Sequence, residues 1–230
     1  MHRLTWVLIL LTSPLAWAGD IVGSIQLDRK FNKKRVVTTV YQLRGAPADA
    51  ALPLDADSEM ERVAVFLTGP KMPAGQPIAA TLRQRGRRFD QEVLVVPAGS
   101  TVSFPNGDPL FHNVFSLSRS KSFDLGYYPQ GQTRAVRFDQ PGIVQVYCHL
   151  HPAMHAAIVV TPGAWSARPS ADGSFSLNDI PAGTYELAVW HNSAGLSRQT
   201  ITVPASGEIR PTVSIPLLAG QSGVPARDPR

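Results

Sequence analysis

The sequence predicts an all-β protein that contains two β-sandwiches. Helical periodicity is almost absent, and short runs rich in Val, Ile and Phe alternate instead with Gly, Pro, Asp and Asn along the chain. The chain has 230 residues, and roughly 210 of them follow a predicted export signal. That length exceeds one small sandwich and suits two.

Each expected strand is a short apolar or alternating run between turn-forming residues. In the first two-thirds of the chain we expect strands at residues 21–27, 36–43, 62–67, 92–96, 101–104, 113–117, 135–138, 142–148 and 156–161. In the last third we expect them at residues 174–177, 183–190, 198–203 and 210–216. Residues 44–60 are rich in Ala, Pro and Asp and are expected to form an exposed loop.

The N-terminus has the pattern of a secretory signal peptide. Arg3 is followed by an apolar run at residues 4–11 and by Ala16-Trp17-Ala18, a small-x-small cleavage site before Gly19. The apolar run is too short to span a bilayer, and no later segment resembles a membrane span. We therefore expect residues 1–18 to be removed and the remaining chain to lie in the periplasm.

Charge excludes one class of partner and leaves another open. Without Arg3 the chain has 21 Lys and Arg against 17 Asp and Glu, a net charge of +4 that is too mild to indicate nucleic acid binding. The densest basic stretch has four arginines, at positions 83, 85, 87 and 88. They could form a docking patch for an acidic partner. The sequence favours the alternative, a solvated hairpin whose charges discourage edge pairing.

A run of soft ligands predicts a metal site. Cys148, His151 and Met154 lie three residues apart each time, and they offer a thiolate, an imidazole and a thioether. His112 is the obvious second imidazole for a trigonal copper site with a weak axial Met. Cys148 is the single cysteine, so a disulfide scaffold and a binuclear copper site with two bridging cysteines are both excluded. The histidines are also too few for a multicopper oxidase.

Residues 78–161 resemble the cupredoxin family. Residues 92–106 look like the paired strands that lead to the first ligand, and Phe111-His112-Asn113-Val114 matches the first-histidine motif. Residues 141–148 look like the strand that delivers the cysteine, and the spacing Cys148-x-x-His151-Pro152-x-Met154 is that of the short amicyanin loop. The resemblance implies one type 1 copper ion bound by His112, Cys148, His151 and Met154.

The same resemblance implies roles for neighbouring residues. Asn113 stands where the family ties the two ligand-bearing segments together by a hydrogen bond. His151 is expected near the surface, inside an apolar patch that serves electron exit. The candidates for that patch are Pro109, Leu110, Pro152 and Ala153.

The ligand loop departs from the amicyanin pattern at two positions. His149 replaces a small polar residue, and Leu150 replaces a common Pro. His149 and His155 are therefore surplus imidazoles near the site, which leaves a second metal or altered ligation open. We expect both to point to solvent, because the residue after the cysteine generally faces away from the metal. His191 belongs to the other domain and is expected to be an ordinary strand-end residue.

The C-terminal part contains Asp172-Gly173-Ser174-Phe175-Ser176-Leu177 and a second run from Ile180 to Trp190. These residues resemble a carboxypeptidase regulatory-like, transthyretin-type sandwich, and the family's first two strands have counterparts at residues 19–25 and 63–67. We therefore expect a cupredoxin domain at 76–163 inserted into a second sandwich made of 19–75 and 164–217, followed by a flexible tail at 218–230. A tandem arrangement, in which residues 19–70 extend the cupredoxin, is the alternative.

These features predict a periplasmic blue copper protein that carries single electrons and is not an enzyme. The sequence shows no nucleophile motif, phosphate loop or nucleic-acid signature. The expected partner is a redox protein, such as a c-type cytochrome or a periplasmic dehydrogenase. Copper handling and an envelope interaction module without electron shuttling are the alternatives.

Overall fold

The computed structural model describes residues 18–28, 59–70 and 72–215, which form β-strands and one short 3-10 helix, η1 (Glu59–Arg62). The predicted all-β class is confirmed. The strand expected at 36–43, the flexible tail and all but the last residue of the signal peptide lie outside the described residues, as does nearly all of the loop expected at 44–60. Within the described ranges, no helix has the length and apolar character needed to cross a membrane.

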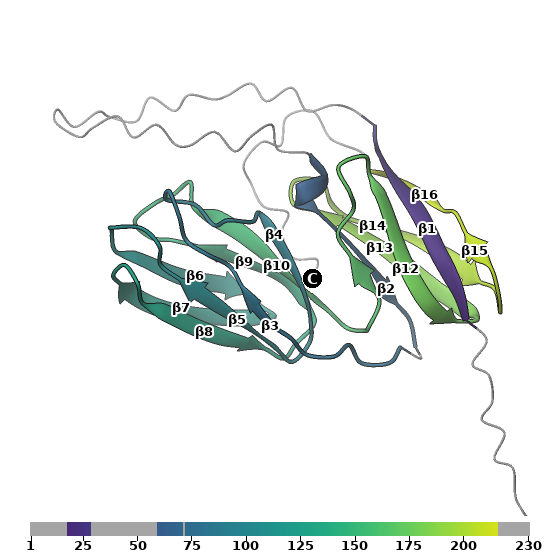
Figure 1. Cartoon of the computed structure of the whole chain (residues 1–230), viewed down its shortest axis with the longest axis horizontal. Helices are drawn as coiled ribbons and strands as arrows, with labels where there is room; N and C mark the ends of the chain where they lie inside the picture. Colours follow the sequence, from purple (N-terminus) through teal and green to yellow (C-terminus); the bar gives the residue numbers. More distant parts are fainter. Residues whose placement is uncertain (1–17, 29–58, 71, 216–230) are drawn as a thin grey trace, which may run out of the picture.

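The first sandwich contains strands β3 to β10 and lies on the left in Figure 1. One sheet has the order β4-β10-β9-β6-β7 and the other the order β3-β5-β8. Large apolar side chains such as Phe104, Phe138 and Ile158 fill the space between these sheets. The strands are β3 (Ala79–Thr81), β4 (Val93–Pro97), β5 (Ser100–Pro105), β6 (His112–Ser118), β7 (Lys121–Tyr128), β8 (Thr133–Phe138), β9 (Gly142–Tyr147) and β10 (His155–Thr161).

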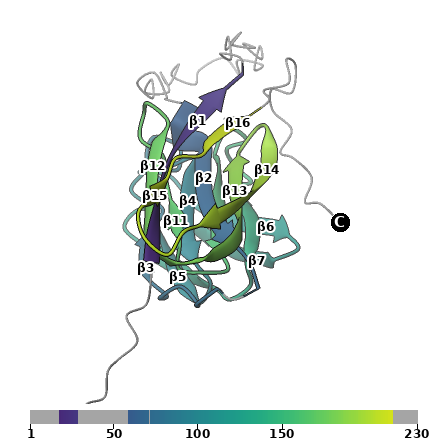
Figure 2. The ribbon, with the colours of Figure 1, turned by 90° about the vertical axis from the view of Figure 1, so that its right-hand side faces the viewer.

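The second sandwich contains the remaining strands and lies in front of the first in Figure 2. One sheet has the order β12-β1-β15, with β16 also pairing with β1, and the other has the order β11-β2-β13-β14. Ile21, Leu67 and Leu187 are among the buried side chains between these sheets. The strands are β1 (Ala18–Leu27), β2 (Val63–Thr68), β11 (Ser166–Ala167), β12 (Ser174–Pro181), β13 (Gly183–His191), β14 (Gly195–Val203), β15 (Glu208–Ile209) and β16 (Thr212–Ile215).

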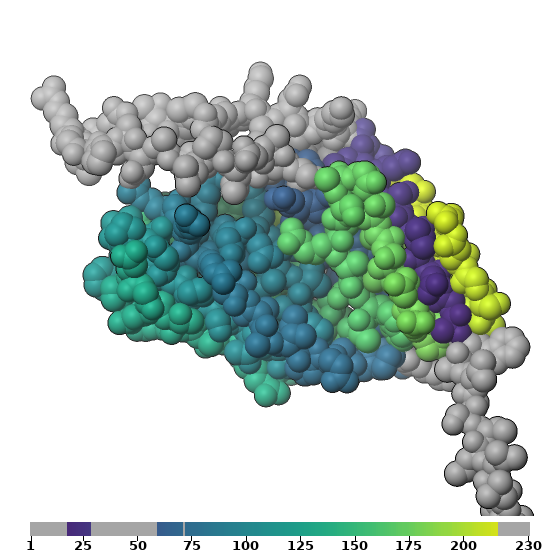
Figure 3. Space-filling model, viewed as in Figure 1, coloured from purple at the N-terminus to yellow at the C-terminus, as the bar shows by residue number. Residues whose placement is uncertain are grey.

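The two sandwiches share an apolar interface, and Figure 3 shows them in contact. Strands β2 and β13 of one and β4 and β10 of the other are buried on both faces. On β10, Ile158 packs into the first core while Val159 packs into a separate cluster between the sandwiches. On β2, Val65 and Phe66 divide in the same way between the second core and this cluster. Burial on both faces explains why these strands are continuous apolar runs rather than alternating ones.

An ion pair adds to this interface. Arg62 at the end of η1 donates to the carboxylate of Glu92, just before β4, at 3.0 Å.

Strands β1 and β2 precede the first sandwich in the chain but belong to the sheets of the second sandwich. The domain bounds expected from the sequence stay a prediction.

Strand β7 is the principal element that the sequence did not predict. Its residues, from Lys121 to Tyr128, have a weak hydrophobic pattern because β7 is an edge strand. The short strands β3, β11 and β15 were also not predicted, because two or three residues form no detectable pattern. Arg62, expected in a strand, ends the helix η1 instead.

The pairing of β6 with β9 brings the start of β6 close to the end of β9, where the candidate metal ligands lie. The two strands are antiparallel and pair through Phe115 and Tyr147. The start of β6, at His112, therefore lies beside the end of β9, which Cys148 follows directly. Residues 36 positions apart in sequence are brought to one end of the sandwich in this way.

The interface between the sandwiches predicts a measurable loss of stability. Val159 is fully buried in the cluster between them. We expect Val159→Ala to lower the free energy of unfolding by about 1–3 kcal/mol, because it removes buried apolar surface and leaves a cavity. Urea denaturation measures this change. Thr200→Ala on the exposed face of β14 is the control, with an expected change within about 0.5 kcal/mol. Equal stability of both variants would contradict the interface.

Candidate metal centre

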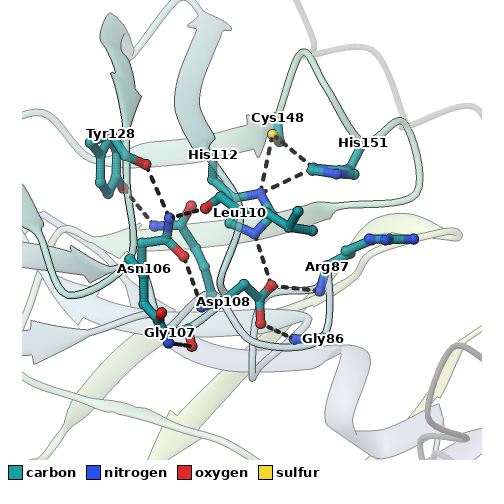
Figure 4. Close-up of polar contacts among 12 residues, drawn as sticks. Gly86, Arg87, Asn106, Gly107, Asp108, Leu110, His112, Tyr128, Cys148 and His151 are labelled. Carbon is teal, nitrogen blue, oxygen red and sulfur yellow. Dashed lines mark hydrogen bonds and ion pairs between the residues drawn. The ribbon is translucent and has the colours of Figure 1, made fainter. Parts of the chain in front are cut away.

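Three predicted ligands meet at the end of the first sandwich. His112, Cys148 and His151 place their ligand atoms within 4.8 Å of one another. The Nδ1 atoms of the two histidines are 3.0 Å apart. The Sγ atom of Cys148 lies 3.9 Å from Nδ1 of His112 and 3.7 Å from Nδ1 of His151. Figure 4 shows the three side chains converging from β6 and from the loop after β9.

The triangle of donor atoms has the size that a transition-metal ion requires. A point about 2.1 Å from all three atoms lies inside it, and metal bonds to imidazole nitrogen and thiolate sulfur are about 2.0–2.3 Å long. Two imidazoles and one thiolate in a trigonal arrangement are the ligands of a blue copper site. The residues present therefore fit a mononuclear copper ion.

Hydrogen bonds fix the loop that carries two of these ligands. Asn113 accepts a hydrogen bond from the backbone N–H of His149 at 2.9 Å, which confirms the expected link between the two ligand-bearing segments. The N–H of Met154 donates to the carbonyl of His151 at 2.8 Å, and the N–H of Cys148 donates to the carbonyl of Met154 at 3.3 Å. The loop is therefore closed on itself independently of a metal.

Met154 is fully buried at the end of this loop. Its side chain belongs to the same apolar cluster as Cys148 and Tyr128. A thioether is the weak axial donor that a blue copper site takes. Its role as the fourth ligand stays a prediction.

Asp108 is a site residue that the sequence analysis did not identify. Its carboxylate lies 2.8 Å from Nε2 of His112 and is almost fully buried. The backbone N–H groups of Gly86 and Arg87 donate to the same carboxylate at 2.6 and 2.8 Å. Since the carboxylate of Asp108 accepts a hydrogen bond from His112, the Nε2 atom of His112 carries the proton. The other ring nitrogen, Nδ1, faces Cys148 and His151, as Figure 4 shows. A carboxylate four residues before His112 was the available sequence signal.

The electrostatics favour a thiolate at Cys148. Burial alone raises the pKa of this thiol, but hydrogen bonds from His112 and from backbone amides outweigh burial and hold the pKa below its usual value. Burial alone would lower the pKa of His112. The contacts with Cys148 and Asp108 outweigh that effect, so its pKa is raised.

His151 is the ligand closest to solvent. Burial, and then the charges of His112 and Arg87, lower its pKa, so its imidazole is kept neutral and available as a ligand. The four apolar residues expected around it, at positions 109, 110, 152 and 153, are all exposed. Phe111 and Leu150 are 57% and 49% exposed. These six exposed residues, which precede His112 or flank His151 in the sequence, are called the apolar patch.

The surplus histidines lie outside the ligand cluster. The imidazole of His149 is 48% exposed and stacks on Phe115 with ring centroids 3.8 Å apart. His155 is exposed at the start of β10. His191 ends β13 as expected, but it is buried and lies 3.3 Å from a carboxylate oxygen of Glu59.

Comparison with known proteins gives structural matches only. No family model and no curated protein matches this chain. A purple cupredoxin from Nitrosopumilus maritimus is 22% identical, covers 36% of this chain and 99% of its own, and has a TM-score of 0.33. Amicyanin from Paracoccus versutus is 22% identical, covers 42% of this chain and 97% of its own, and has a TM-score of 0.34. A copper-containing nitrite reductase from Thermus scotoductus is 24% identical, covers 41% of this chain and 25% of its own, and has a TM-score of 0.35.

These solved structures are cupredoxins or a copper enzyme, and each covers less than half of this chain. The metal assignment does not depend on them, because it follows from the donor atoms and their distances. The resemblance of the second sandwich to the carboxypeptidase regulatory-like family stays a prediction.

The position of Asp108 predicts an effect on metal affinity. Asp108→Asn keeps one acceptor oxygen, which can accept from one of the two backbone amides, and removes the carboxylate that orients His112. We expect copper affinity to fall by about 10- to 100-fold, as for other groups that orient a ligand. Competition with a chelator of known affinity measures this change. Asp139→Asn is the control, because that carboxylate is exposed and pairs only with Arg137 in the described structure. Equal affinity in both variants would contradict the role of Asp108.

The two shifted pKa values predict how copper binding depends on pH. The pKa of His112 lies above its ordinary value of 6.5, so a proton competes with the metal in weakly acidic solution. The pKa of Cys148 lies below its ordinary value of 9.0, so its thiolate forms at lower pH than that of a free thiol. We expect copper affinity to rise as the pH increases through the pKa of His112, with release of protons on binding. Calorimetry in buffers of different ionisation enthalpy measures both quantities, and an affinity independent of pH would contradict the assignment.

Proposed function

We propose that this chain is a type 1 blue copper protein that carries single electrons between redox partners. One copper ion is held by His112, Cys148 and His151, with Met154 as the weak axial ligand. The observation that carries the proposal is the triangle of two imidazole nitrogens and one thiolate sulfur, whose centre lies at bonding distance from all three atoms.

The scaffold suits electron transfer because it limits movement at the ligands. A bound copper ion supplies a one-electron couple between Cu(I), which favours soft ligands, and Cu(II), which favours nitrogen. His112 is held by Asp108, and the loop of Cys148 is held by Asn113 and by its own backbone bonds. Ligands fixed from outside keep one geometry in both oxidation states.

The route for electrons leads through His151. Its ring contacts the ring of His112 with centroids 4.7 Å apart, and it is the partly exposed member of the cluster. The exposed apolar residues that flank His151 in the sequence and precede His112 offer apolar surface for contact with another protein.

The predicted signal peptide supports a periplasmic location, where a c-type cytochrome or a periplasmic dehydrogenase would serve as redox partner. Copper delivery is disfavoured because open trafficking sites present methionines at the surface. Met60 and Met154 are buried in different cores, and Met72 packs against the core of the second sandwich.

The visible spectrum tests the ligand set. We expect the Cu(II) protein to show an intense blue thiolate charge-transfer band that is absent in Cys148→Ala, because the thiolate is its origin. The control His149→Gln should keep the band, since that imidazole faces away from the cluster. A colourless copper adduct of the unmodified protein would rule out the blue copper proposal.

The reduction potential tests Met154 and the shuttle role together. Met154→Leu conserves volume in a buried position, so stability should change by less than about 1.5 kcal/mol. Loss of the thioether removes a donor that stabilises Cu(II), so we expect a higher potential with the blue band retained. Protein-film voltammetry measures this shift. An irreversible response of the unmodified protein would favour copper storage, and an unchanged potential in Met154→Leu would remove Met154 from the ligand set.

A further inference from the structure

Asn113 makes two contacts that hold the loop of the metal centre. Its side-chain oxygen accepts a hydrogen bond from the N–H of His149 at 2.9 Å. Its backbone N–H is one of the groups that favour the thiolate. Burial raises the pKa of Cys148, and hydrogen bonds from His112 and then from the backbone of Asn113 lower that pKa. Asn113 is only 1% exposed, so neighbouring protein groups rather than water determine how its side chain lies.

A carboxylate on the neighbouring strand fixes the orientation of this amide. The Oδ1 atom of Asp124 accepts a hydrogen bond from Nδ2 of Asn113 at 2.8 Å. An amide whose nitrogen donates to a carboxylate presents its oxygen on the other side, and that oxygen holds the N–H of His149. The two hydrogen bonds form a chain from Asp124 on β7, through Asn113 on β6, to the residue that follows the ligand cysteine.

A bulge in β7 fixes the carboxylate itself. Between the pairing of Asn113 and the pairing of Asp124, β6 advances by two residues and β7 by three, so β7 contains one extra residue. Within this bulge Gly126 has a φ of 63°, which glycine adopts without strain. The N–H of Gly126 donates to Oδ1 of Asp124 at 2.8 Å. The oxygen that accepts from Asn113 is therefore held by the backbone of the bulge.

His149 contacts the same carboxylate through its ring. Its Nε2 atom lies 3.8 Å from Oδ2 of Asp124. The ring stacks on Phe115 with ring planes 5° apart, and Phe115 pairs with Asp124 across the two strands. This surplus histidine thus lies against the strand that carries Asp124. Its backbone N–H, however, is the group that Asn113 holds.

We propose that Asp124 is a positioning residue for the copper site, which acts through Asn113 on the hydrogen bonds of the Cys148 loop. The inference rests on the proposed function for the presence of copper. Hydrogen bonding around the cysteine sulfur tunes the potential of a blue copper site. A donor at the sulfur withdraws electron density from the thiolate, so Cu(II) is stabilised less and the potential is higher. Without its acceptor on β7, Asn113 holds both the sulfur and the N–H of His149 less firmly.

Hydrogen exchange in the copper-free protein tests the positioning directly. The N–H of His149 is protected while it donates to Asn113. We expect Asp124→Ala to speed its exchange by on the order of tenfold, because the amide that accepts it loses its anchor. Asp124→Asn keeps an oxygen that can accept from Asn113, so exchange should stay within about twofold of the unmodified protein. NMR measures both rates. Equal acceleration at the N–H of Ile158, in the middle of β10, would reduce the effect to global stability and overturn the proposal.

The sign of the change in reduction potential separates positioning from charge. Loss of a negative charge near copper favours Cu(I) and raises the potential, whereas weaker hydrogen bonds to the thiolate lower it. We expect a lower potential in Asp124→Ala. In Asp124→Asn we expect the potential of the unmodified protein or a slightly higher one. Protein-film voltammetry gives both values. A higher potential in Asp124→Ala, or an equally lowered potential in both variants, would contradict the proposal.

Asp139→Ala is the matched control. The side chain of Asp139 is 51% exposed, against 57% for Asp124. It precedes β9, whereas Cys148 follows the other end of that strand. Exchange at His149 and the reduction potential should both equal those of the unmodified protein. Equal effects of Asp139→Ala and Asp124→Ala would rule out a specific role of Asp124.

The outcomes for Asp124 and for the proposed function are distinguishable. A colourless copper adduct, together with exchange at His149 that follows the Asp124 variants, would overturn the proposed function and keep the positioning of the loop by Asp124. A blue, reversible centre whose potential and exchange are unchanged in Asp124→Ala would keep the proposed function and overturn the role of Asp124.

Discussion

The hydrogen bonds of Asp108 connect three features that are separate in the sequence. Its carboxylate orients His112 and accepts from both central amides of the arginine turn at residues 85–88, and its backbone N–H donates to the side chain of Asn106 in the segment that leads to β6. Asp108 is almost fully buried. Loss of any of these hydrogen bonds would leave a buried polar group without a partner, which costs free energy of folding. One side chain therefore sets the geometry of a metal ligand and the position of that turn.

The sheets behind the site explain how such geometry can be held without a metal. Strands β4 and β10 are covered by their own core on one face and by the second sandwich on the other. Strand β9 pairs with β10 and delivers Cys148, so a ligand strand adjoins one that is buried on both faces. The second sandwich thus contributes to the rigidity of the first through the interface. The proposed electron-transfer site, which would keep one geometry in two oxidation states, would benefit from that support.

Much of the candidate site could be predicted from local sequence, because three of its four predicted ligands lie in one loop. The spacing of Cys148, His151 and Met154 is a local property, and the choice of His112 required only a second imidazole in a strand context. Asp108 was not predicted, since its role depends on a turn about twenty residues earlier. For the arginine stretch the sequence favoured a solvated hairpin, but it could not show that the backbone of this hairpin bonds to Asp108.

The sequence by itself determined the all-β class, most strand positions in the described residues and the set of soft ligands. These features depend on patterns within a few residues: hydrophobic alternation predicts strands, and the spacing of Cys, His and Met side chains predicts donor atoms. Only the tertiary structure decided that β7 completes a sheet and that β2, β4, β10 and β13 are buried on both faces. It also decided that Asp108 joins His112 to the arginine turn. Such contacts join segments distant in the chain, and they arise only when packing brings those segments together.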